Sequence, residues 1–320
     1  MNGSEVIIGI DTSNYTTSVA LLGSDGELVA NLKAPLSVKE GERGLRQSDA
    51  VFSHVKNIPA LMERVREILD GRHPVAVGVS ERPRNTEGSY MPCFLSGVAV
   101  AEAVSCALGV KLYRFSHQCG HVMAALYSSG AGALAGEVFG AFHVSGGTTE
   151  LLRVRRCDSG FHAELVGGTL DLNAGQVIDR IGVAMGLPFP AGPHIEAAAT
   201  AFSGRLPSYR ISGRGTEVNL SGLENIALKV YRETGDVSLT SALVLDLVGR
   251  SILSMAEAYR EKYGDEALVF AGGVMANRQI RERLSKLPRV YFAEPMLSAD
   301  NAVGIAELAR EEYIKDKNYV

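Results

Sequence analysis

Each half of the chain opens with the same succession of elements, and this repetition constrains the fold more than any other feature. A buried strand is followed by a tight polar turn and then by further strands. The turns lie at 12–17 in the first half and at 145–149 in the second. A Rossmann unit would instead pass directly from a strand to a helix. The opening strands are predicted over 6–11, 18–22, 28–32, 138–144, 150–155 and 161–166.

The remaining segments show either helical spacing or short apolar runs between Gly, Pro and polar residues. The segment 188–193 is expected to be a rigid Pro-rich loop, and 204–222 is polar without a clean period. Helices are predicted over 49–69, 95–108, 117–127, 172–185 and 239–263, and from 276 and 302 onward. Further strands are predicted over 75–79, 111–115, 267–270 and 290–292.

This pattern predicts an α/β protein with two similar lobes, each a mixed sheet with flanking helices. A length of 320 residues also suggests two domains. The Gly- and Ser-rich break at 128–132 separates an N-terminal lobe, 1–130, from a C-terminal lobe, 131–301. We expect the helix over 302–320 to pack back on the N-terminal lobe, and we expect a nucleotide cleft between the lobes.

The composition limits the class of protein. Hydrophobic residues make up 46% of the chain and the net charge is -4, so contact with a nucleic acid requires a local basic patch or a partner. The cysteines form no C-x-x-C pair, which favours a reduced cytosolic setting. We see no signal-peptide pattern and no apolar run that approaches a membrane span. The chain is therefore expected to be cytoplasmic and without membrane contact.

Two histidines and a distant carboxylate form a candidate metal site. His117 and His121 stand four residues apart, so on a helix they share one face. Two imidazoles in this arrangement can hold one metal ion, and Asp300 can complete the set of ligands. A zinc-protease helix would also carry a general-base Glu beside its first His, and this chain does not.

Glycine-rich or polar turns follow buried strands at 11–13, 145–149 and 271–274. Glycine turns allow backbone N–H groups to face an oxyanion, and the N-terminus of a helix adds a positive dipole. A single turn of this kind is usually only a hairpin. Their occurrence in series predicts a site for the phosphate chain of a nucleotide.

Taken together, the motifs resemble the tRNA threonylcarbamoyladenosine transferases, a family long labelled O-sialoglycoprotein endopeptidases. The resemblance runs in order through nearly the whole chain and implies the duplicated actin/sugar-kinase/Hsp70-type fold. The matching segments are 9–13, His117-x-x-x-His121, 144–147, 168–171, 175–179, 190–193, 220–223, 272–277 and 298–301.

The resemblance implies roles for particular residues. One iron or zinc ion would be ligated by His117, His121 and Asp300. The loop 143–147 would contact ATP or a threonylcarbamoyl-AMP intermediate. Asp179 would bind a ribose or threonyl group, and Asp11 and Asp179 are the carboxylates that we expect to act in catalysis. The residues expected to hold the nucleotide are Ser145, Gly146, Gly147, Thr148, Asp179, Gly192 and Asn277.

The implied reaction transfers a threonylcarbamoyl group from its mixed anhydride with AMP to N6 of adenosine 37 in tRNA. The metal would act as a Lewis acid and template. Placement of the weakly nucleophilic adenine amine would provide much of the rate. The resemblance also implies that tRNA is a partner and that helper proteins form a transferase complex with the chain. It is compatible with a dimer.

The chain departs from the family pattern on the substrate side. Thr148 stands where the family usually has His, and Leu172 stands where it has a second Asp. Gln176 replaces the Glu of a Gly-Glu-Ala-Phe-Asp motif, and 80–84 replaces a Gly-Pro-Gly stretch. These changes indicate a divergent paralogue. An ATP-binding regulatory or scaffold protein and a carbamoyltransferase for another acceptor therefore stand beside the transferase, and a metalloprotease ranks last.

Overall fold

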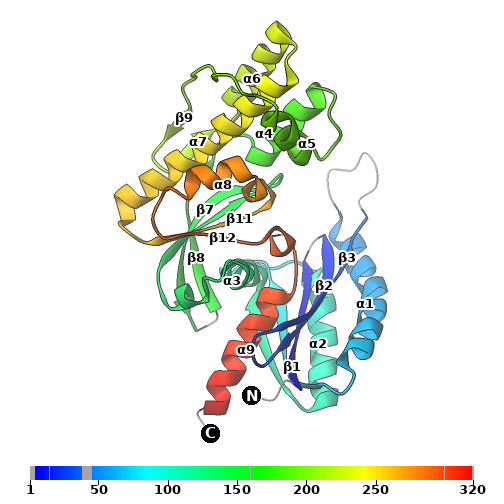
Figure 1. The fold of residues 1–320 in the computed structure, drawn as a ribbon. Coiled ribbons are helices and arrows are strands. Elements are labelled where there is room, and N and C mark those ends of the chain that lie inside the picture. Colours follow the sequence, from blue (N-terminus) through cyan, green and yellow to red (C-terminus); the bar gives the residue numbers. More distant parts are fainter. Residues whose placement is uncertain (1–3, 14, 38–44, 159, 299, 319–320) are drawn as a thin grey trace. The chain divides into compact units, whose positions relative to one another are not determined.

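The computed structural model describes residues 4–13, 15–37, 45–158, 160–298 and 300–318. Its chain divides into two compact units, which are described separately (Figure 1). Unit 1 consists of Met1–Ser128, Arg156–His162 and Ala299–Val320. Unit 2 consists of Ser129–Arg155 and Ala163–Ser298. The last two residues of the expected C-terminal helix lie outside the described part of the chain.

Unit 1 contains a sheet of order β3-β2-β1-β4-β5. Antiparallel pairing joins β1, β2 and β3, and parallel pairing joins β1, β4 and β5. The strand sequences are almost continuously apolar where both faces are covered by helices. The strands are β1 Glu5–Ser13, β2 Thr16–Gly23, β3 Leu28–Pro35, β4 His73–Arg82 and β5 Lys111–Ser116. The helices are α1 Gln47–Leu69, α2 Phe94–Leu108, α3 His117–Ser128 and α9 Val303–Asn318.

Helix α9 packs directly against β1, β4 and α3 (Figure 1). Glycines allow this approach: a Cβ atom at Gly9 would lie 2.5 Å from the carbonyl oxygen of Ala302, and one at Gly78 would lie 2.8 Å from that of Ile305. A Cβ atom at Gly304 would lie 1.9 Å from the carbonyl oxygen of Gly120 in α3. The first turn of α9 is therefore held against the first turns of α3.

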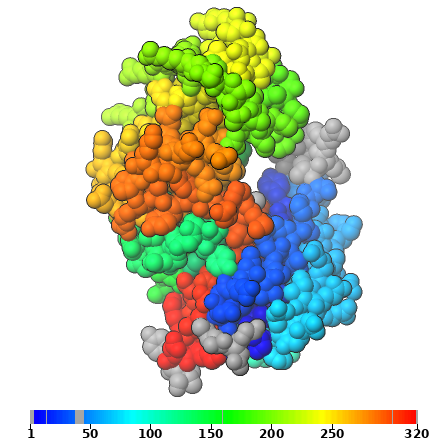
Figure 2. Space-filling model, viewed as in Figure 1, coloured from blue at the N-terminus to red at the C-terminus, as the bar shows by residue number. Residues whose placement is uncertain are grey.

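Unit 2 contains a sheet of order β12-β11-β6-β7-β8-β10-β9. One hydrophobic core joins this sheet to α4, α6 and α7. The orange segment that carries α8 and the yellow segment that carries α6 are visible at the surface in Figure 2. The strands are β6 Phe139–Val144, β7 Thr149–Cys157, β8 Gly160–Thr169, β9 Ser212–Arg214, β10 Glu217–Asn219, β11 Ala267–Ala271 and β12 Val290–Phe292. The helices are α4 Ala174–Ala184, α5 Gly192–Thr200, α6 Ser221–Thr234, α7 Val237–Tyr263 and α8 Arg278–Leu284, with 3-10 turns at Gly132–Gly136, Gly273–Ala276 and Pro295–Leu297.

Several sequence expectations need correction. The loop expected over 188–193 ends in helix α5, which begins at Gly192 and buries only Ile195 and Ala199, too few positions to show a helical period. Helix α6 was not expected, although Leu223, Ala227 and Val230 are buried at helical spacing. The helix expected from 276 is a 3-10 turn followed by α8.

Helix α7 also corrects the expectation that no apolar run approaches a membrane span. By length and composition, its 27 residues could cross a bilayer. However, 72% of its most apolar window is buried inside the protein. A long, largely apolar helix that is mostly covered by other elements is typical of a protein core.

The close contact between α9 and α3 yields a stability prediction. Alanine is a better helix former than glycine by about 1 kcal/mol, so Gly304→Ala would be stabilising if space allowed. Because the new methyl group would meet the backbone oxygen of Gly120, we expect instead a loss of roughly 3 kcal/mol in the free energy of unfolding. Denaturant unfolding measures this change. Gly132→Ala, where no atom lies within 4 Å, is the matched control, and equal stability of the two variants would contradict the packing argument.

Candidate functional site

Two imidazoles and one carboxylate converge in unit 1. His117 and His121 lie on successive turns of α3, and Asp300 lies just before α9. The Nε2 atom of His121 is 3.3 Å from Oδ1 of Asp300, and the Nε2 atom of His117 is 3.7 Å from the same oxygen. One potential ligand atom from each residue lies within 4.8 Å of the others. The structure thus brings the two histidines that the spacing singled out together with the distant carboxylate that was expected to complete the set.

A buried carboxylate fixes the orientation of His117. Its Nδ1 atom lies 2.7 Å from Oδ2 of Asp11, at the end of β1. The backbone N–H of Ser13 donates to the other oxygen of Asp11 at 2.9 Å. When Nδ1–H donates to the carboxylate, Nε2 is left with its lone pair on the side of Asp300. Asp11 has an exposed fraction of 0%. Its position suits it to orient His117.

The electrostatics of the cluster favour a cation. Burial tends to raise the pKa of Asp11 and of Asp300, but the attraction of the neighbouring imidazoles outweighs it and leaves the pKa of each carboxyl below its ordinary value. Burial likewise tends to lower the pKa of His117, but the charges of Asp11 and Asp300 raise it. The two carboxylates therefore stabilise positive charge at the position between them.

The residues present fit a divalent metal. Nitrogen and oxygen ligands bind zinc at about 2.0–2.2 Å, so two ligands on one ion lie about 3–3.6 Å apart. The separation of 3.3 Å between His121 and the Asp300 oxygen lies within this range, and the separation of 3.7 Å for His117 lies just above it. A donor set of two histidines and one carboxylate is typical of catalytic zinc and non-haem iron sites, which keep coordination positions open.

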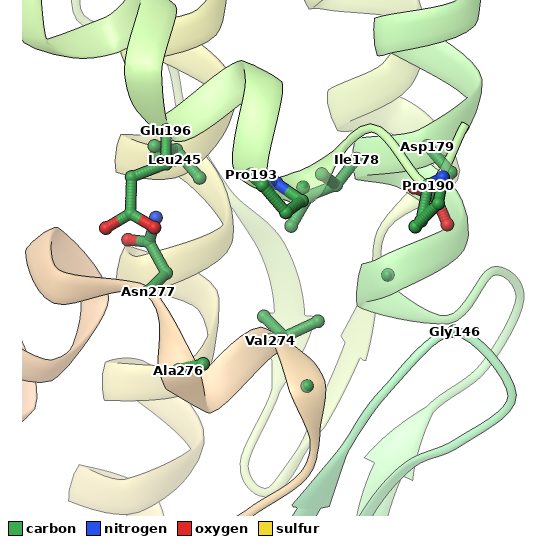
Figure 3. A pocket seen from close by; sticks show the side chains of 13 residues that line it. Gly146, Ile178, Asp179, Pro190, Pro193, Glu196, Leu245, Val274, Ala276 and Asn277 are labelled. Atoms are coloured by element: carbon green, nitrogen blue, oxygen red, sulfur yellow. The ribbon is translucent and has the colours of Figure 1, made fainter. Parts of the chain in front are cut away.

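Unit 2 contains a separate cavity of about 380 Å³ (Figure 3). Its walls come from the turn after β6, from α4 and α5, and from the 3-10 turn that precedes α8. Among the residues predicted to hold the nucleotide, those that line the cavity are Gly146, Asp179, Gly192 and Asn277. The cavity therefore joins two of the predicted glycine turns, 145–149 and 271–274.

The other predicted residues shape the first of these turns. The hydroxyl oxygen of Ser145 accepts hydrogen bonds from the N–H groups of Gly147 at 3.3 Å and Thr148 at 3.1 Å. A Cβ atom at Gly175, near the start of α4, would lie 2.6 Å from the backbone nitrogen of Gly146. Ser145, Gly147 and Thr148 do not line the cavity as it is drawn in Figure 3, but they hold Gly146 at its wall.

Polar side chains of the cavity also fasten its walls. Oδ1 of Asp179 accepts the N–H of Ala191 at 2.7 Å and so ties the Pro-rich loop to α4. Asn277 caps α8, because its Oδ1 atom accepts the N–H of Ile280 at 3.1 Å. A carboxylate that sequence reasoning missed, Glu196 of α5, accepts the N–H of Arg278 at 2.8 Å and lies beside Asn277 in Figure 3. In the sequence, the only feature that could have pointed to Glu196 is its place four residues after Gly192, on a helix that was not expected.

Comparison with known proteins agrees with the motifs. The sequence pattern of the family described as tRNA N6-adenosine threonylcarbamoyltransferase matches residues 42–307. The enzyme of that description from Streptococcus suis is 31% identical over 336 residues, which covers 99% of this chain and 95% of the relative. The one from Carboxydothermus hydrogenoformans is 30% identical and covers 98% of this chain and 94% of the relative.

Solved structures share the fold at low identity. Full-length HypF in its phosphate- and nucleotide-bound form is 13% identical with a TM-score of 0.58, over 96% of this chain and 46% of HypF. A ROK hexokinase from Thermus thermophilus is 14% identical with a TM-score of 0.54, over 97% of this chain and 99% of the hexokinase. These likenesses confirm the duplicated actin/sugar-kinase/Hsp70-type α/β fold that the resemblance implied.

The metal cluster makes a prediction about metal content. We expect the purified protein, loaded with zinc or ferrous iron, to hold about one ion per chain, and His121→Ala to lose it. Asp11→Asn would leave the ligands in place but weaken their orientation, so we expect metal affinity to fall about 10–100-fold. Elemental analysis and a competitive chelator titration measure both quantities.

The exposed His73 provides the matched control, because it lies in the same unit but away from the cluster. His73→Ala should retain the ion with unchanged affinity. Retention of the ion by His121→Ala at unchanged affinity would show that the ligands lie elsewhere.

Proposed function

The chain belongs to the tRNA N6-adenosine threonylcarbamoyltransferase family, and from this premise we propose a metal-dependent acyl transfer that uses both sites described above. N6 of adenosine 37 attacks the carbamoyl carbon of threonylcarbamoyl-AMP, forming a C–N bond. The bond from that carbon to the phosphate oxygen breaks, AMP leaves, and N6 loses a proton. The observation that carries the proposal is the convergence of His117, His121 and Asp300 in a chain that matches the family over most of its length.

The cavity of unit 2 supports binding of the nucleotide. Carboxylates accept hydrogen bonds from hydroxyl groups and repel phosphates, so Asp179 and Glu196 suit the ribose end of a nucleotide. Gly146 and Gly273 present backbone without side chains, which allows close approach of phosphate oxygens. A volume of about 380 Å³ lies within the ordinary range of ligand sites.

The cluster of unit 1 supports the metal-dependent part of the proposal. A divalent metal bound by this cluster would supply a Lewis acid that polarises an acyl or phosphoryl oxygen. Asp11 keeps His117 in one tautomer, and the packing of α9 on α3 keeps Asp300 beside both imidazoles. Rigid ligands of this kind reduce reorganisation during the reaction. The identity of the metal, iron or zinc, is part of the proposal.

Two alternatives retain a specific observation in their favour. Thr148 and Leu172 stand where the family usually carries ionisable side chains, and neither can move a proton at neutral pH. Leu172 packs against the core of unit 2. A nucleotide-binding regulatory or scaffold protein and a carbamoyltransferase for another acceptor are therefore the competing functions. A metalloprotease is disfavoured because no glutamate accompanies the histidine pair.

Helper proteins and a second copy of the chain, as partners other than tRNA, are also part of the proposal. Helper proteins or a second copy of the chain need an exposed apolar surface, and α1 offers one. Phe52 and Val55, three residues apart on this helix, have exposed fractions of 65% and 57%. Cytoplasmic location is likewise part of the proposal.

Reconstitution tests the proposed reaction. With ATP, threonine, bicarbonate, a synthase that makes threonylcarbamoyl-AMP and unmodified tRNA, we expect threonylcarbamoyladenosine in the digested nucleosides. Asp179→Ala should weaken nucleotide binding at least tenfold, because it removes both a ribose acceptor and the bond that holds Ala191. Calorimetric titration with ATP measures that loss.

Glu282→Ala, which removes an exposed carboxylate of the same unit, is the matched control for nucleotide binding. Nucleotide binding without any modified adenosine, in metal-loaded protein, would favour the scaffold alternative. A modified small molecule in place of tRNA would favour the carbamoyltransferase.

A further inference from the structure

The outer face of α8 and the turn that follows it carry cations that form no ion pair with the described part of the chain. Arg278, Arg281 and Lys286 line a shallow depression of about 460 Å³ together with Glu282 and Ser285. None of the three cations forms an ion pair with a residue that the structure describes. The positive side chains on this face outnumber the single carboxylate. The face is therefore a local basic patch on a chain whose net charge is -4.

Neighbouring arginines behave differently. Arg283 of the same helix pairs with Asp246, and Arg289 pairs with Glu137 at 2.5 Å. Arg283 and Arg289 therefore have ionic partners, whereas Arg278 and Arg281 form no ion pair with a described residue. An ionic partner normally reduces the electrostatic attraction between a cation and an incoming anion. Since Arg278, Arg281 and Lys286 form no ion pair with a described residue, their attraction for an anion is not reduced in this way.

The core fixes which face of α8 is turned outward. Ile280 and Leu284, four residues apart, are fully buried and anchor the helix to the core of unit 2. Arg281 packs over the ring of Phe292, with its guanidinium carbon 5.0 Å from the ring centroid. Such stacking holds the plane of the guanidinium in place and leaves its N–H edge free to donate two parallel hydrogen bonds to the oxygens of a phosphate. The orange segment that contains α8 is visible at the surface in Figure 2.

The basic face begins at the rim of the nucleotide cavity. Asn277 lines the cavity and caps α8, and Arg278 is the next residue along the chain. From there the helix extends for seven residues, or about 10 Å at its usual rise. The phosphates of one strand of duplex DNA recur about every 3.4 Å along the axis, which sets the scale of phosphate spacing along a nucleic-acid strand. The face can therefore contact successive phosphates of a strand that reaches the cavity.

We propose that the α8 face, defined by Arg278, Arg281 and Lys286, binds the sugar-phosphate backbone of the tRNA acceptor at the rim of the nucleotide cavity. This inference rests on the proposed function, since it assigns a docking surface to the substrate of the same reaction. Contacts of this kind position a nucleic acid without reading its bases. The surface should thus bind tRNAs with little regard to sequence, and its affinity should decrease with salt.

Charge reversal on the face tests the inference directly. Lys286→Glu and the double variant Arg281→Glu, Lys286→Glu should bind unmodified tRNA at least tenfold more weakly than the unaltered protein. Each lost phosphate contact should reduce the slope of log affinity against log salt by about 0.7–0.9. Fluorescence anisotropy with labelled tRNA at several salt concentrations measures both. Lys286 is exposed, so its single variant should fold normally, which circular dichroism verifies.

Arg64→Glu on α1 is the matched control, because Arg64 is also exposed and forms no ion pair with a described residue. It should bind tRNA as the unaltered protein does. ATP affinity should be unchanged in all variants. Unchanged tRNA affinity and salt slope in the double variant would overturn the inference, and so would a loss confined to binding of an acidic protein.

The test is separable from that of the proposed function. If tRNA binding depends on the α8 face but no modified adenosine forms, the surface stands and the transfer reaction fails. If modified adenosine forms while the double variant binds and modifies tRNA normally, the reaction stands and the surface fails.

Discussion

The close packing of α9 on α3 is the interaction on which the candidate metal site depends. Gly304 and Gly120 bring the two backbones into contact, and no residue with a side chain fits at Gly304 without displacing one of them. Because Asp300 lies three residues before the start of α9 at Val303 and the histidines occupy the first turns of α3, this contact sets the distance between the carboxylate and both imidazoles. A segment from the end of the chain is thereby built into unit 1, beside strands from its beginning.

The candidate metal site of unit 1 and the cavity of unit 2 have one structural feature in common. In each, a polar side chain near the ligand position also fastens the surrounding backbone: Asp11 orients His117 and binds the N–H of Ser13, while Asp179 binds the N–H of Ala191. Asn277 lines the cavity and caps the helix whose outer face carries the cations. Substitution of these residues should therefore affect geometry as well as direct contact with a ligand, which is why binding and turnover must be measured separately.

The sequence was informative where a pattern has one dominant physical cause. The spacing of His117 and His121 predicted a shared helix face, and buried strands followed by polar turns predicted the duplicated fold. It was less informative where tertiary packing decides. The role of Asp11 depends on a neighbour more than a hundred positions away, and Glu196 lies on a helix too short to show periodicity. The basic face of α8 could not be recognised from sequence, because only the structure shows which arginines already have ionic partners.

The central claim is that His117, His121 and Asp300 together hold one catalytic divalent ion, and X-ray absorption spectroscopy of the metal-loaded protein tests it most directly. The account predicts a first shell of nitrogen and oxygen only, at about 2.0–2.2 Å, with the outer-shell scattering that imidazole rings produce. A shell that contains sulfur, or one of oxygen alone without imidazole scattering, would contradict it.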